Sequence, residues 1–139
     1  AFKSDLCNNA APMPLAFLVL PLVLHGPSLD LVVSTNRSSG LHLFIGKLGE
    51  KRENLLAIHS RALALRSLTL ESLMLGEQTA LMRIDPSTAN VWCYALREGT
   101  RFPALPERLR RITPACERLG HWFAGVSDQK VAHALKVEF

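Results

Sequence analysis

The residues that come nearest to a chemical motif are Gly40, Gly46 and Lys47, whose order superficially resembles a phosphate-binding loop. Such a loop needs four residues between its two glycines and a magnesium-binding hydroxyl directly after the lysine. Here five residues separate the glycines, and Leu48 follows Lys47. The stretch also has the apolar spacing of an amphipathic helix. The sequence therefore predicts no nucleotide-binding site at this position.

The histidines and cysteines do not have the spacing of metal ligands. The histidines are His25, His42, His59, His121 and His133, and the cysteines are Cys7, Cys93 and Cys116. No two histidines lie three or four residues apart, and there is no C-x-x-C pair of the kind that zinc sites use. No serine stands in a nucleophile elbow. We therefore expect a protein that is not an enzyme, with no catalytic residue, no bound cofactor and no metal.

Composition points to one compact helical domain. The chain has 139 residues, of which 48% are hydrophobic and 20% charged, enough apolar mass for one core. Leucine is abundant and aromatic residues are few, which favours helix over sheet. The apolar run 16–24 is about half the length of a membrane span and contains Pro21. We predict a single domain over 1–139 in a soluble, cytoplasmic protein with reduced cysteines, no membrane segment and no small-molecule substrate.

The pattern of apolar residues predicts the elements of the first two thirds of the chain. Pro14 opens an apolar helix over 14–25, buried on every side, with a kink at Pro21; residues 28–38 give no clear pattern. Two amphipathic helices follow over about 39–48 and 50–65, then a turn with Thr69 as the N-cap of a third helix over 70–78. Two short apolar runs, 80–84 and 91–96, flank an Asp/Pro/Ser/Asn cluster and predict a β-hairpin.

This order of elements defines the predicted fold class. It is mainly α with a small β-hairpin (α+β), and its core over about 39–96 resembles a winged helix-turn-helix. Helices flank this core on both sides, the C-terminal ones over about 105–135. Thr113 and Ser127 are predicted N-caps there, the first followed by Pro114. Because the chain starts without methionine, we also expect residues ahead of Ala1.

The third predicted helix is better suited to a protein than to DNA. Over 70–78 it carries Glu71 and Glu77 and no lysine or arginine, so phosphate would be repelled from it. Met74 and Leu75 are the predicted contact pair on this helix. Arginines are enriched further on, at Arg97, Arg101, Arg108, Arg110, Arg111 and Arg118. Of these, Arg108, Arg110 and Arg111 are the candidates for contact with phosphate or an acidic surface, whereas the favoured interpretation of the arginines is a solvated helix face.

Two adjacent aromatic residues, Trp122 and Phe123, are the other candidates for partner binding. Neighbouring residues on a helix point about 100° apart, so one ring can pack in the core while the other faces outward. An outward ring would be an anchor for a partner, since aromatic residues dominate interface energetics. The alternative is that both rings are structural.

Several strings of the sequence are similar to the middle component of three-component ABC-ATPase systems. They are Pro14–His25, Arg61-Ala62-Leu63, Thr69–Leu73, the tail Cys116–Ala124, which is similar to the family's LGxWFA signature, and Leu135-Lys136-Val137. Such systems include the Lamassu anti-phage and anti-plasmid defences. Their parts are an SMC-like ATPase, an effector that is often a nuclease, and this small component.

The resemblance implies a bridging or regulatory subunit. It would join the heads of an SMC-like ABC ATPase dimer, restrain an effector such as a nuclease, and meet DNA through the complex. ATP and magnesium would then be bound by the ATPase. Two alternatives remain open: a winged-helix DNA-binding regulator, and a secretion-type chaperone that cradles an effector. The chaperones tend to be acidic, whereas this chain carries a net charge of +4.

Overall fold

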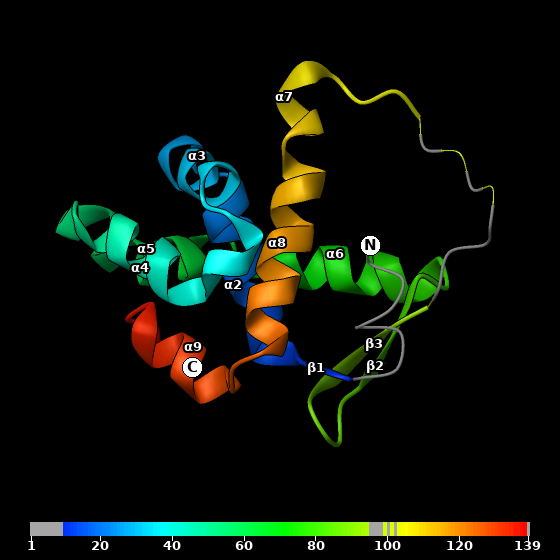
Figure 1. The fold of residues 1–139 in the computed structure, drawn as a ribbon. Coiled ribbons are helices and arrows are strands. Elements are labelled where there is room, and N and C mark those ends of the chain that lie inside the picture. The colour runs from blue at the N-terminus through cyan, green and yellow to red at the C-terminus, as the bar shows by residue number, and fades with distance from the viewer. Residues whose placement is uncertain (1–9, 95–98, 100, 102, 139) are drawn as a thin grey trace.

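The computed structural model describes residues 10–94, 99, 101 and 103–138, arranged as Figure 1 shows. The helices are α2 (Met13–Val23), α3 (Gly26–Ser34), α4 (Gly40–Gly49), α5 (Arg52–Ala64), α6 (Arg66–Gln78), α7 (Glu107–Arg110), α8 (Ile112–Ala124) and α9 (Asp128–Ala134), with a 3₁₀ turn η1 (Arg37–Ser39). The strands β1 (Ala11–Pro12), β2 (Met82–Asp85) and β3 (Asn90–Cys93) form one antiparallel sheet in the order β1-β3-β2. The predicted fold class, mainly α with a small β-hairpin, is confirmed.

Helix α2 is the central element of the fold (Figure 1). It packs against α3, α5, α6, α8 and α9, which explains why its sequence is apolar on every side. Leu18 and Leu22 are fully buried in it, and Pro21 lies inside the helix as predicted. The helix is shorter than the predicted 14–25, because Leu24 ends it and His25 begins the next element.

The segment 28–38, which the sequence left undecided, is helix α3 followed by the 3₁₀ turn η1. The ring of His25 caps α3 by accepting a hydrogen bond from the Ser28 amide (3.4 Å), and Pro27 stands in the first turn, where its missing N–H costs nothing. Helices α2 and α3 meet at a bend of 103°. This bend places Leu29 and Val32 of α3 in the same core as α2.

Two of the predicted helix starts are wrong. Helix α6 begins at Arg66, so Thr69 lies inside it, where its hydroxyl donates to the Leu65 carbonyl (3.0 Å). Helix α8 begins at Ile112, so Thr113 is also inside a helix. In both places the preceding residues continue in helical or near-helical backbone, and an N-cap requires extended backbone. The predicted cap at Ser127 is confirmed: its hydroxyl accepts from the Lys130 amide (3.4 Å) at the start of α9.

The hairpin forms where the sequence placed it, in slightly shorter strands; residues 95 and 96 of the predicted second strand lie outside the described part. Strand β1, which the sequence did not predict, pairs with β3 through Ala11 opposite Val91 and Pro12 opposite Asn90. The Met13 amide adds a hydrogen bond to the Ala89 carbonyl (2.7 Å). The sheet is therefore joined to the first turn of the central helix α2.

Arg118 of α8 fastens the end of α3. Its guanidinium donates to the carbonyls of Val32 (2.8 Å), Val33 (2.5 Å) and Thr35 (2.8 Å). These carbonyls have no partner within the helix, and a cation at a helix C-terminus is favourable. Arg118 therefore has a structural role, and it does not belong to a free basic surface.

Replacing Arg118 by methionine should lower the free energy of unfolding by about 2–3 kcal/mol, because the side-chain stem remains while three carbonyls lose a charged donor. Urea denaturation of both proteins measures this change. Arg110→Met is the matched control: its Nε donates to one carbonyl, that of Leu105, on an exposed side chain, so we expect little change. Equal stability of all three proteins would contradict the structural role.

No single described helix is long and apolar enough to cross a membrane; the bent pair α2 and α3 passes that test only when the two helices are counted together.

Candidate partner-binding surfaces

The structure buries both aromatic residues that the sequence proposed as partner anchors. Trp122 is 3% exposed and Phe123 is 6% exposed. The Trp122 ring stacks on Phe44 of α4 with 5.4 Å between centroids, and its indole N–H donates to the Arg37 carbonyl (2.9 Å). Of the two interpretations that the sequence left open, an outward anchor is therefore wrong for the folded chain, and both rings are structural. Trp122 joins α8 to α4 and η1, and both residues belong to the main core.

The arginines near the start of α8 are mostly engaged within the chain. Arg111 forms an ion pair with Asp30 of α3 (2.6 Å), and Arg110 donates to the Leu105 carbonyl (3.1 Å). Arg97 and the side chain of Arg108 lie outside the described residues. The side chains of Arg110 and Arg111 remain exposed. Because Arg111 is paired with Asp30 and Arg110 is bonded to a loop carbonyl, the two do not form a free cationic patch.

Helix α6 carries the predicted pair Met74 and Leu75 on its surface. Met74 is 57% exposed and Leu75 is 61% exposed. The helix buries Thr69, Leu73 and Gly76, and the two predicted residues lie on different flanks because they are adjacent. Leu68, which is 44% exposed, is seven residues before Leu75 and therefore shares its side of the helix. We name Leu68 and Leu75 the α6 stripe.

Helix α6 starts four residues earlier than predicted, which adds a positive charge to it. Arg66, which is exposed, now belongs to its first turn, so the helix is not free of cations as the sequence analysis supposed. Of the two acids, Glu71 is exposed, whereas the Glu77 carboxylate accepts a hydrogen bond from the Ile84 amide (3.1 Å) on edge strand β2. Glu77 thereby occupies a backbone donor at a sheet edge, one that would otherwise be available to another strand.

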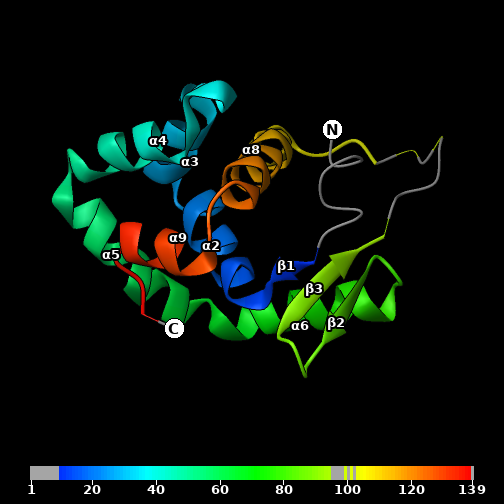
Figure 2. The same cartoon turned by 60° about the horizontal axis from the view of Figure 1, so that its bottom comes forward.

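Helix α6 is seated on the hairpin through Gly76. A Cβ at this position would lie 2.7–2.9 Å from three side-chain atoms of Met82 on β2, so the absent side chain lets Met82 approach the helix backbone. Met82 is opposite Cys93 in the strand register, and Val91, two residues before Cys93, is buried. One face of the hairpin is thus turned toward α6, as Figure 2 also shows.

The other face of the hairpin carries two exposed aromatic residues, Trp92 and Tyr94. Trp92 is 40% exposed and lies opposite Arg83, while Tyr94 is 52% exposed and its amide bonds to the carbonyl of Leu81, itself 49% exposed. Alternate residues of a strand point to opposite faces, so these four side chains share one side. We name Leu81, Arg83, Trp92 and Tyr94 the hairpin outer face.

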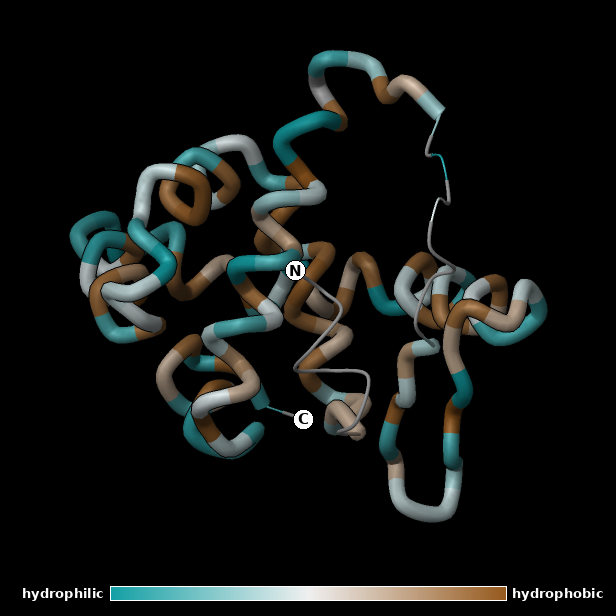
Figure 3. The backbone as a smooth tube through the Cα atoms, turned by 45° about the vertical axis from the view of Figure 1, so that its right-hand side comes forward, coloured by the Kyte–Doolittle hydropathy of each residue, from teal (hydrophilic) through white to brown (hydrophobic). Residues whose placement is uncertain are grey.

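This surface was not predicted from the sequence, although the hairpin carries a signal for it. Hydrophobic and hydrophilic residues alternate along the hairpin, as the colours in Figure 3 show. In such a pattern the residue between two inward apolar residues faces out, and here Trp92 stands between Val91 and Cys93. Tryptophan, tyrosine and arginine are the residue types enriched at interface hot spots, so this face has the composition of a protein-binding site.

A partly buried cluster of His25, Ser28 and Arg61 contains the one serine–histidine contact among the described residues. His25 Nδ1 lies 2.8 Å from Ser28 Oγ, and Arg61 donates to Ser28 Oγ (3.5 Å) and to the Asn54 carbonyl (3.3 Å). A catalytic pair needs a third group that orients the base, and the partner of this pair is a cation instead. Through these contacts the cluster joins α5 to the start of α3.

The pKa of His25 in this cluster is lowered from its ordinary value of 6.5, first by burial and second by the positive charge of Arg61. The folded chain therefore binds a proton at His25 less readily than the unfolded chain. The stability that comes from the neutral ring is complete above pH 6.5 and is lost as the pH falls through the lowered folded value.

Urea denaturation between pH 7.5 and pH 5 tests this linkage. The wild type should lose more stability over that range than His25→Asn, because asparagine caps the helix without titrating. Asp85 does not confuse the comparison, since hydrogen bonds from Ser87 and Thr88 hold its pKa below the usual 3.8. The same pH dependence in both proteins would show that His25 is not the titrating group.

The described residues contain no group of three His, Cys, Asp or Glu side chains that could hold a metal ion. Cys116 is half-buried on α8, where burial raises the pKa of its thiol and the Glu117 carboxylate adds to the rise. A thiol with a raised pKa is a poor nucleophile at neutral pH. The exposed apolar and aromatic surfaces described above are therefore the candidate functional features of the described part of the chain.

The chain matches the family model described as ABC-three component (ABC-3C) system Middle Component 3 over residues 3–139. Comparison with curated proteins and with solved structures gave no match. The family match spans nearly the whole chain and includes α6, the hairpin and the C-terminal helices.

Proposed function

Since the chain belongs to the ABC-3C Middle Component 3 family, we propose that it is the non-enzymatic bridging subunit of a Lamassu-type defence complex. In this complex it seats on the heads of an SMC-like ATPase dimer and restrains an effector such as a nuclease until DNA is sensed. The ATPase binds ATP and magnesium, and the complex acts in the cytoplasm. The observation that carries the proposal is the hairpin outer face, which exposes Trp92 and Tyr94 beside Arg83.

The two exposed surfaces support a protein partner over DNA. DNA binding requires several cations facing phosphate, and on the hairpin outer face Arg83 stands with three uncharged side chains. The α6 stripe consists of two leucines separated by a turn that carries Glu71. Apolar and aromatic surface of this kind contributes to binding when it is buried against another protein. The core over 39–96 accordingly uses its third helix and hairpin to contact protein, even if it retains a winged-helix order of elements.

The test is a tagged pull-down of this chain co-expressed with the products of its two neighbouring genes, followed by the mass of the intact complex. Recovery with a large coiled-coil ATPase and a second, enzymatic subunit is the expected result, and the mass gives the stoichiometry. A homodimer that shifts a DNA probe would support a winged-helix regulator instead. A stable homodimer that holds only the effector would support a chaperone.

A further inference from the structure

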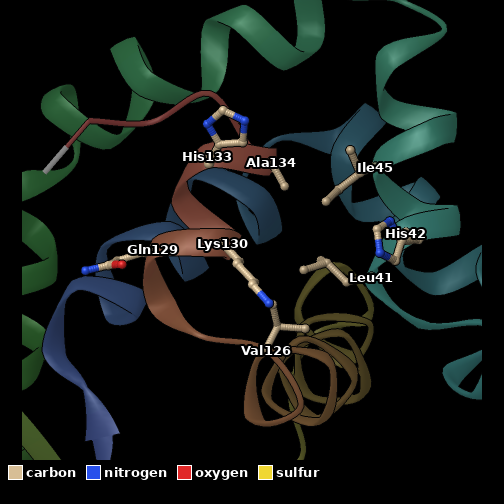
Figure 4. A pocket seen from close by; sticks show the side chains of 8 residues that line it. All are labelled: Leu41, His42, Ile45, Val126, Gln129, Lys130, His133 and Ala134. Carbon is tan, nitrogen blue, oxygen red and sulfur yellow. The ribbon is translucent and has the colours of Figure 1, made fainter.

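A groove between α4 and α9 lies on the opposite side of α2 from the hairpin (Figures 1 and 2). Its volume is about 380 Å³, at the lower end of the range for pockets that take small ligands. Figure 4 shows its lining residues, which are Leu41, His42, Ile45, Val126, Gln129, Lys130, His133 and Ala134. They come from α4, from α9 and, at Val126, from the link between α8 and α9.

The floor of the groove is apolar and its rim is basic. Leu41, Ile45, Val126 and Ala134 supply the floor, with Ile45 and Ala134 pointing toward each other in Figure 4. The Lys130 side chain lies over this floor toward Val126, and within the described part of the chain its ammonium makes no ion pair. None of the lining residues is acidic, so the positive charge at the rim is not neutralised from within the groove.

We propose that this groove is a second docking site, which takes an acidic amphipathic helical segment of a partner protein. An apolar side chain of the segment enters between Ile45 and Ala134, and a carboxylate one turn away pairs with Lys130. Charge complementarity selects this occupant: an apolar floor alone would accept any hydrophobic segment, whereas the unpaired cation disfavours a basic one. DNA is disfavoured by the apolar floor, which would be left without a partner.

The proposal deepens the proposed function and rests on it in one respect, namely that the partner is another subunit of the same system. A bridge needs two surfaces that can be occupied together. Neither α4 nor α9 is among the elements packed against α6 or the hairpin. The two surfaces also differ in character, since the hairpin outer face is aromatic and the groove is aliphatic with a basic rim, so they suit different partners.

The first experiment uses the co-expressed complex. Lys130→Glu should weaken retention of one partner about ten-fold or more, because like charges would then face each other across the contact. Lys51→Glu, which makes the same charge change on an exposed residue at the start of α5, should retain both partners. A photo-crosslinker at Gln129 should join a partner peptide with an acidic residue within one helical turn of an apolar one. Wild-type retention by Lys130→Glu, or a crosslink to a basic segment, would overturn the proposal while leaving the bridging function standing.

The second experiment uses the isolated chain, so that it is decisive even if no complex forms. The probe is a synthetic amphipathic peptide with leucine along one face and glutamate along the other, and its lysine counterpart is the control. Fluorescence anisotropy should show binding of the glutamate peptide, about ten-fold weaker binding to Ile45→Asp, and none of the lysine peptide. Equal binding of the two peptides, or no binding of either, would overturn the groove proposal.

Discussion

Replacing Trp92 by alanine is expected to weaken binding of the partner protein by about 30-fold or more, with little effect on the fold. Truncation of a hot-spot residue costs about 2 kcal/mol or more in binding free energy, which corresponds to that factor. Trp92 is already 40% exposed, and its neighbours in the hairpin face α6 through the opposite side of the sheet. Removing its ring therefore takes little from the core. Surface plasmon resonance with the purified ATPase measures the loss.

Two further variants make the result specific to the proposed surfaces. Leu75→Asp places a charge on the α6 stripe and should also weaken binding, because an unpaired carboxylate would be buried in the contact. Leu24→Ala is the matched control: this leucine is 50% exposed at the end of α2, outside both surfaces, and its loss should leave affinity unchanged. Equal affinity of Trp92→Ala and wild type would remove the hairpin outer face from the interface.

Replacing Trp122 by alanine should lower the free energy of unfolding by about 3–5 kcal/mol, the usual range for a buried aromatic residue. The ring is 3% exposed and stacks on Phe44, so its removal leaves a cavity between α8 and α4. A domain of this size has a total stability of about 5–15 kcal/mol, so this one change removes a large part of it. Chemical denaturation of wild type and variant measures the difference.

The more conservative Trp122→Phe separates packing from hydrogen bonding. Phenylalanine keeps much of the stack on Phe44 but cannot donate to the Arg37 carbonyl, so we expect a loss of about 1–2 kcal/mol. Partner affinity of folded Trp122→Phe should match wild type, since the ring does not reach the surface. Unchanged stability together with lost binding would restore the interpretation of Trp122 as a partner anchor.

Local sequence signals located the elements whose formation depends on a single stretch of chain. The apolar run before His25 is the central helix, the Asp/Pro/Ser/Asn cluster is the turn between β2 and β3, and Ser127 caps α9. In each case a few neighbouring residues carry the whole signal. The resemblance of the sequence to an ABC three-component middle component is also confirmed, by the family match over residues 3–139.

Local sequence signals were wrong or undecided where the same residues are compatible with two backbone conformations and tertiary packing determines which one forms. Thr69 and Thr113 have the side chains of N-caps, yet both lie inside helices, because the residues before them continue the helix. A threonine hydroxyl can bond back to the carbonyl four residues earlier, as Thr69 does with Leu65, so the residue type is compatible with either position. The undecided segment 28–38 became helix α3 for a similar reason, since its apolar residues are buried by α2 and α8.

The sequence by itself determined the class of the fold, the position of its central helix and hairpin, and the family to which the chain belongs. Only the tertiary structure decided which candidate residues are available to a partner. The sequence left open whether Trp122 packs in the core or faces outward, and it counted Arg118 among the enriched arginines. In the structure Phe44 stacks on Trp122, and backbone carbonyls more than eighty positions away accept hydrogen bonds from Arg118. Trp92 and Tyr94 became candidates because they stay 40% and 52% exposed, and Lys130 because it forms no ion pair with another described residue. The exposure of a side chain depends on residues that are distant in sequence, and a local sequence pattern does not show which of these residues pack against it.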